Sequence, residues 1–143
     1  MRRSLSVVVT VTAFFLISGC SGSVDGPVIE GNRSSGGSDA EVFGIVVVEG
    51  DCIYLRQEGI DTRYPVVWPH GTSWNSAELA IKLPNGKLVY DGDQVDGGGG
   101  YPKQANLDQY TVAEGVELAL RCVDNPYGEI AVFNSGADID VTS

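Results

Sequence analysis

The segment from Trp68 to Trp74, WPHGTSW, is the densest group of residues with binding or catalytic chemistry in the chain. It places Trp68, His70 and Trp74 within seven residues, around a proline and a glycine. Tryptophan offers a large flat contact surface, so two exposed indoles here would form a platform for a sugar ring or a protein partner. The alternative is structural: Trp68 ends a core strand and Trp74 fills the mouth of a barrel.

Groups suited to catalysis are few. His70 is the only histidine, and no serine lies in a Gly-x-Ser-x-Gly sequence of the kind that exposes a nucleophile. The 19 acidic residues make chance carboxylate pairs common, so they give no specific support to a glycosidase-like pair. We therefore expect a non-catalytic protein, with a carboxylate-dependent hydrolase of cell-wall glycans as the minor alternative.

The acidic, glycine-rich segment 90–101 suggests a calcium or phosphate site but fits neither. Asp91 and Asp93 are spaced as in an EF-hand loop, yet Asp96 stands where that loop needs glycine. The run Gly97 to Gly100 lacks the lysine of a phosphate-binding loop and follows three aspartates. We expect a solvated turn followed by a sharp glycine bend, with no metal and no cofactor.

The first nineteen residues have the pattern of an export signal. Arg2 and Arg3 precede the apolar run 7–17, which is eleven residues long. A helix of that length falls short of the roughly 20 residues that span a bilayer core. The pattern predicts a signal peptide over 1–19 rather than a retained transmembrane helix.

The end of this segment carries a more specific motif. Ile17-Ser18-Gly19-Cys20 matches the lipobox, so the chain resembles the bacterial lipoproteins. The resemblance implies cleavage before Cys20, a diacylglycerol on its sulfur and acylation of the new amino group. Two or more acyl chains give durable attachment, which places the protein on the cell membrane, facing away from the cytoplasm.

The charge of the chain excludes some partners. Without Arg2 and Arg3, 7 of the 9 basic residues remain against 19 acidic ones, a formal charge of −12. Nucleic-acid binding requires clustered lysine and arginine, which this chain lacks. We expect no nucleic-acid partner and repulsion from anionic head groups.

Composition divides the exported part into a tether and a domain. Residues 20–39 are rich in glycine and serine, and the sequence predicts a flexible tether there. Its 19 residues after Cys20 would have a mean reach of about 25 Å, enough to lift the domain clear of the head groups. Residues 40–143 form the predicted single domain.

The domain has short apolar segments separated by turn residues, which is typical of a β protein. Asn85-Gly86 favours a tight hairpin, and Asn75-Ser76-Ala77-Glu78 is the only helical hint, a helix cap followed by a single turn. Apolar alternation through Val116, Leu118 and Leu120 favours a strand over 115–123. The seven predicted strands are 41–48, 52–57, 63–68, 79–83, 87–90, 115–123 and 129–134. We predict a small all-β barrel or sandwich, and the turn in segment 87–101 loosely resembles barrels of the OB type.

With Cys20 occupied by lipid, Cys52 and Cys122 remain, and export favours a disulfide between them. Two thiols and His70 do not make a four-ligand zinc site. The sequence thus predicts a lipid-anchored envelope protein whose β domain binds a protein or a small ligand. The alternative is a structural or accessory subunit of an envelope complex.

Overall fold

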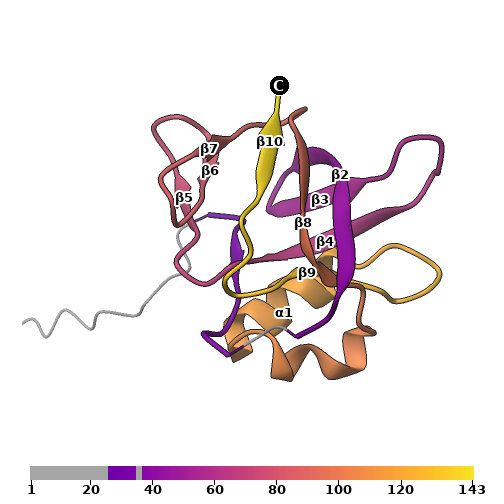
Figure 1. The fold of residues 1–143 in the computed structure, drawn as a ribbon. Coiled ribbons are helices and arrows are strands. Elements are labelled where there is room, and N and C mark those ends of the chain that lie inside the picture. The colour runs from indigo at the N-terminus through magenta and orange to yellow at the C-terminus, as the bar shows by residue number, and fades with distance from the viewer. Residues whose placement is uncertain (1–25, 35–36) are drawn as a thin grey trace, which may run out of the picture.

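The computed structural model describes residues 26–34 and 37–143 (Figure 1). The predicted signal peptide 1–19 and Cys20 lie outside these residues. The strands are β1 Ile29–Glu30, β2 Ala40–Glu49, β3 Cys52–Arg56, β4 Arg63–Trp68, β5 Ser73–Asn75, β6 Ala80–Lys82, β7 Leu88–Val89, β8 Gln94–Gly100, β9 Ala131–Phe133 and β10 Asp140–Thr142. The helices are a 3-10 helix at Gln104–Gln109 and α1 at Ala113–Cys122.

Five strands close into a barrel in the order β2, β3, β4, β9, β8 and back to β2. All neighbours are antiparallel except β4 and β9, which run parallel. Counted along the chain, the barrel strands are ordered 1-2-3-5-4 around a closed five-stranded barrel. The predicted all-β class is confirmed, and the barrel alternative is the one that the chain adopts.

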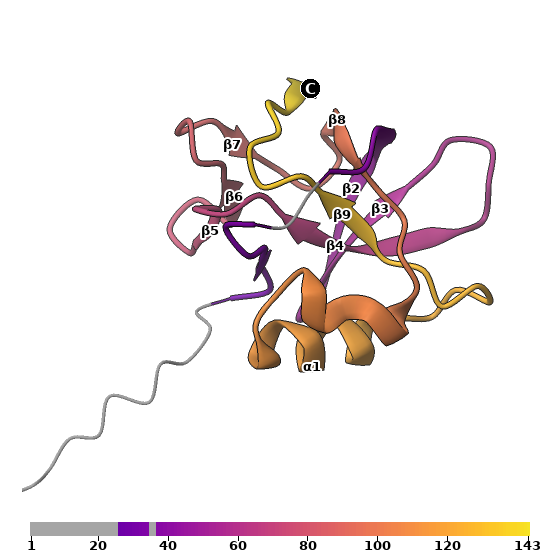
Figure 2. The same cartoon turned by 60° about the horizontal axis from the view of Figure 1, so that its bottom comes forward.

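Two apolar cores meet at β4. Alternate residues of this strand face opposite sides, so Val66 and Trp68 pack inside the barrel while Val67 packs outside it against α1. Figure 2 shows α1 and the 3-10 helix lying together against this outer side. Because both faces are covered, β4 reads as a continuous apolar run rather than an alternating one.

The small sheet β5-β6-β7 adds apolar side chains to the barrel core. Its β6–β7 hairpin confirms the prediction from Asn85-Gly86, with Gly86 at a φ of 87°. The turn predicted after Asn75 is also present, because the Asn75 Oδ1 accepts hydrogen bonds from the Ala77 and Glu78 amides.

The strand predicted over 115–123 is wrong, because this segment belongs to helix α1. Gly115, Leu118, Ala119 and Cys122 form its buried face, with the spacing of a helix. Leu120, which the alternating pattern placed in the core, is 47% exposed. A ten-residue segment satisfied both periods, and the helix is favoured because it covers the outer face of β4.

The glycine bend predicted over 97–100 is also wrong, because these residues end strand β8. None of the four glycines has a positive φ. They provide space instead: a Cβ on Gly99 would overlap the Val132 carbonyl oxygen, and one on Gly97 would press on the Phe133 ring. The run lets β8 approach β9 closely where the barrel closes.

The predicted tether over 20–39 is wrong for residues 26–34. Val28 and Ile29 are 5% and 3% exposed, and β1 pairs in parallel with the end of β4. The folded domain therefore begins by Gly26.

The disulfide between Cys52 and Cys122 is present. It joins the start of β3 to the last residue of α1, so it attaches the helix to the barrel wall. Arg63 reinforces the same corner through ion pairs with Glu49 and Asp124.

We predict that Gly99→Ala destabilises the domain by about 3 kcal/mol, because the added methyl group meets backbone rather than a flexible side chain. Denaturant unfolding measures the loss. The matched control is Gly136→Ala, where no atom lies within 4 Å of the new Cβ. Equal stability of the two variants would contradict this account of the barrel closure.

We predict that reducing the disulfide lowers the free energy of unfolding by about 4 kcal/mol, since it opens a ring of about 70 residues in the unfolded chain. Unfolding curves with and without reductant measure the difference. The double variant Cys52→Ala, Cys122→Ala should match the reduced protein and be indifferent to reductant.

Candidate functional site

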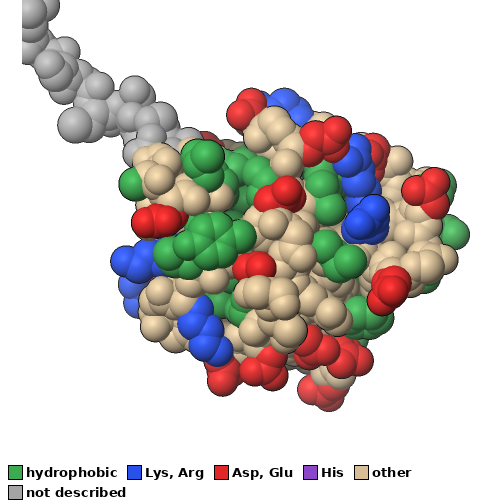
Figure 3. Space-filling model, turned by 90° about the horizontal axis from the view of Figure 1, so that it is seen from above, with side chains coloured by type: hydrophobic (Ala, Val, Ile, Leu, Met, Phe, Trp, Pro, Cys, Tyr) green, Lys and Arg blue, Asp and Glu red, His purple; other side chains and the backbone are tan. Residues whose placement is uncertain are grey.

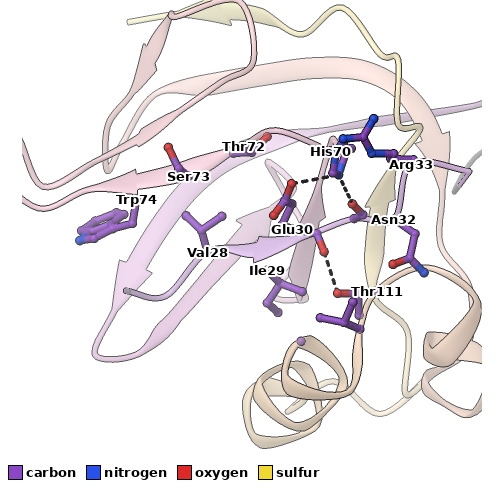
Figure 4. Close-up of a pocket in the computed structure, with 13 residues that line it drawn as sticks. Val28, Ile29, Glu30, Asn32, Arg33, His70, Thr72, Ser73, Trp74 and Thr111 are labelled. Atoms are coloured by element: carbon purple, nitrogen blue, oxygen red, sulfur yellow. Dashed lines mark hydrogen bonds and ion pairs between the residues drawn. The ribbon is translucent and has the colours of Figure 1, made fainter. Parts of the chain in front are cut away.

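A groove of about 600 Å³ runs alongside β1 (Figure 4). Its walls come from β1, from the connection between β4 and β5, and from the start of α1. Trp74 and Val28 lie at one end and Arg33 at the other. The lining residues are Val28, Ile29, Glu30, Gly31, Asn32, Arg33, His70, Thr72, Ser73, Trp74, Thr111, Val112 and Gly115.

Hydrogen bonds on both sides hold the β1 segment in place. The Gly31 amide donates to the Trp68 carbonyl oxygen at 2.8 Å, on the barrel side. On the helix side, the Asn32 amide donates to the Tyr110 carbonyl oxygen at 2.7 Å. The Thr111 hydroxyl donates to the Glu30 carbonyl oxygen, also at 2.7 Å. The floor of the groove is therefore a fixed backbone.

A glycine lets the helix approach this floor. A Cβ on Gly115 would overlap the Thr111 hydroxyl and press on the Ile29 side chain. The small residue in the first turn of α1 thus sets the width of the groove beside β1.

Glu30 and His70 contact each other across the middle of the groove. His70 Nδ1 lies 2.9 Å from Glu30 Oε1 and 3.2 Å from the Gly31 carbonyl oxygen. Both neighbours are acceptors, so Nδ1 carries the proton, and in the neutral ring Nε2 is left as an acceptor. Glu30 Oε1 also accepts from the Gly71 amide at 2.7 Å, which fixes the turn that holds His70.

The predicted binding loop is divided by the fold. His70 and Trp74 both line the groove. Trp68 is fully buried and packs on Phe133, with 5.4 Å between ring centroids. The structural interpretation of Trp68 is therefore confirmed, and a platform made of both indoles is excluded.

Trp74 is partly buried against the barrel core and also touches the start of the described chain. A Cβ on Gly26 would overlap the Trp74 ring, so the glycine backbone lies directly on the indole. One part of the ring is thereby covered while another part remains at the groove.

The aspartates of segment 90–101, Asp91, Asp93 and Asp96, do not gather into a calcium site. Asp91 Oδ1 accepts from the Val48 amide and Asp93 Oδ2 accepts from the Tyr90 amide, each at 2.8 Å. Asp93 is 8% exposed rather than solvated. Over residues 26–34 and 37–143, no group of three or more histidine, cysteine, aspartate or glutamate side chains is arranged to hold a metal.

Asp96 has a different neighbour, Glu41 on β2. A hydrogen bond between the two carboxyl groups, together with the charge of Asp96, raises the pKa of Glu41 above its ordinary value. Figure 3 shows acidic side chains spread over the upper face of the domain, with several basic ones among them.

Sequence reasoning missed Glu30, Val28 and Ile29, which build the groove floor. The available signal was short: Val28-Ile29 is an apolar pair within a stretch of small and polar residues. A two-residue strand has no readable period, and its burial depends on the edge of β4.

Comparison of the chain with protein-family models, with curated proteins and with solved structures found no match. Among the described residues, no helix has both the length and the apolar character needed to cross a membrane.

We predict that Glu41→Gln raises the unfolding temperature at pH 7. Because the pKa of Glu41 is raised, the folded state binds the Glu41 proton more tightly than the unfolded chain does. Stability therefore falls as pH rises from the ordinary glutamate pKa through the raised pKa of Glu41. The increase in unfolding temperature caused by Glu41→Gln should therefore become smaller as pH falls toward the ordinary pKa of a glutamate.

Thermal unfolding between pH 3 and pH 8 measures this dependence. Glu58→Gln, which removes the same charge from the exposed β3–β4 loop, is the control and should lack the pH-dependent gain. Identical profiles for the two variants would mean that Asp96 does not act on Glu41.

Proposed function

We propose that the chain is a lipid-anchored envelope protein whose non-catalytic β domain binds a small ligand with a sugar ring in the groove beside β1. The observation that carries the proposal is the groove itself, which has Trp74 at one end and the Glu30–His70 pair at its centre. Concave sites with apolar walls and a few placed polar groups are typical of small-ligand binding.

The chemistry of the walls favours a neutral ring with polar edges. Trp74 and Val28 offer apolar surface, and the His70 ring and Glu30 carboxylate offer hydrogen-bonding groups beside it. A sugar presents both an apolar face and hydroxyl groups. The net charge of −10 on the chain disfavours anionic ligands.

The groove contacts favour binding over catalysis. The Thr72 hydroxyl donates to the Pro69 carbonyl oxygen, and the Thr111 hydroxyl donates to that of Glu30. These two hydroxyls are thus committed to backbone rather than to His70. A base without a nucleophile in contact is suited to hydrogen bonding with a ligand.

The anchor is proposed from the Ile17-Ser18-Gly19-Cys20 motif. The Cys52–Cys122 disulfide supports export, because such bonds persist in oxidising compartments. Mass spectrometry of the native protein should show a diacylglyceryl group on a new N-terminal Cys20. An unmodified thiol at Cys20, or an uncut leader, would contradict the anchor.

We predict that a neutral tetramer of N-acetylglucosamine binds the groove and changes the emission of Trp74. Trp74→Ala should weaken binding about tenfold, because it removes the aromatic face. Calorimetry and nuclear magnetic resonance shifts of residues 28–33 provide the measurement.

The control is Tyr127→Ala, which removes another aromatic side chain, 58% exposed, from outside the groove lining. It should leave the affinity unchanged. The sugar assignment fails if the tetramer shifts no groove signal at millimolar concentration, or if both variants bind as the unaltered protein does.

A further inference from the structure

The turn between β5 and β6 carries an unusual leucine. Leu79 is 69% exposed, the highest value among the exposed large apolar side chains of the described residues. Of all the described residues, Leu79 is also the one non-glycine residue with a positive φ, at 52°. Left-handed backbone is unfavourable for leucine, and glycine or asparagine would adopt it more readily.

The turn itself is firmly built. Asn75 Oδ1 accepts from the Ala77 and Glu78 amides, each at 3.1 Å, and Asn75 pairs with Ala80 across the hairpin. The fold thus holds Leu79 outward at a backbone cost and leaves most of its side chain in solvent. Backbone strain that keeps an apolar side chain in solvent is typical of a functional contact.

This turn lies beside the point where the chain enters the domain. Gly26 lies on the ring of Trp74, and Trp74 immediately precedes Asn75 on β5. Figures 1 and 2 both show the described chain beginning on the β5 side, while the β3–β4 loop projects from the opposite side. In Figure 3, one of several groups of apolar side chains lies close to the place where the grey atoms begin.

The folded residues 26–34 leave little chain between this place and a lipid on Cys20. Six residue steps separate Cys20 from Gly26, and they span at most about 20 Å even when fully extended. A domain of about 100 residues has a radius of gyration of about 13 Å, so it is wider than this connection is long. The β5 side must therefore stay close to the head groups.

We propose that the β5–β6 turn docks on the phospholipid bilayer, with Leu79 inserted among the head groups and Trp74 at the interface. The inference rests on the proposed lipid anchor. An exposed leucine partitions favourably into the interface, and so does the uncovered part of a half-buried tryptophan beside it. The contact is apolar rather than electrostatic, because the chain is acidic and Glu78 lies next to Leu79. The docked domain holds its groove near the membrane surface.

The test uses the native protein, purified with its Cys20 lipid and reconstituted in phosphatidylcholine vesicles that contain a head-group nitroxide. Mass spectrometry first establishes the lipid on Cys20. The measured quantity is quenching of tryptophan emission by the nitroxide. Trp74→Phe identifies the contribution of Trp74, because it leaves buried Trp68 as the remaining indole.

Leu79→Asn should at least halve the quenching of Trp74. It should not lower the unfolding midpoint, because asparagine tolerates the left-handed backbone better than leucine does. The matched control is Ile60→Asn, an apolar residue of similar exposure, 51%, on the β3–β4 loop at the opposite side. It should leave the quenching unchanged.

Full quenching in Leu79→Asn, with the lipid present on Cys20, would overturn membrane docking and leave the anchor standing. Absence of the lipid would overturn both. A clear drop in the unfolding midpoint of Leu79→Asn would assign the leucine to the fold and overturn the proposal. Stronger quenching after phosphatidylglycerol is added would indicate attraction by charge and would overturn the apolar mode of contact.

Discussion

The last residues of β4 pair with two further strands at once, and the rest of the structure depends on this shared pairing. Val66 and Val67 pair with β9, which closes the barrel, while Val67 and Trp68 pair with β1, which forms the floor of the groove. Both partners run parallel to β4. The barrel and the candidate site are therefore built on adjacent residues of a single strand, and a shift of its register would disturb both.

The same shared pairing explains why both faces of β4 are covered by other parts of the domain. With β9 and β1 paired to its last residues, β4 is buried inside the barrel and also outside it, where α1 packs. The disulfide fixes the end of that helix to β3. The close approach of α1 to β1 then requires glycine at 115, and the groove forms where the helix, the strand and the turn after β4 come together.

The site and the proposed anchor are linked by geometry. Because β1 is part of the fold, the connection from Cys20 is short, and with the proposed lipid in place the side with Trp74 and Leu79 would be the side held toward the membrane. The long predicted tether would have left the orientation of the domain free. A ligand for the groove would then be met at the membrane surface rather than at a distance from it.

The sequence by itself determined the features that depend on few neighbouring residues. The Asn85-Gly86 hairpin, the turn at Asn75, the strand 63–68 and the pairing of the two remaining cysteines follow from local backbone preference or from counting. Only the tertiary structure decided that 115–122 is a helix, that glycines 97–100 lie in a strand and that Val28-Ile29 is buried. The local sequence of each of these short segments is compatible with two conformations. The surface against which the segment packs determines which of the two forms.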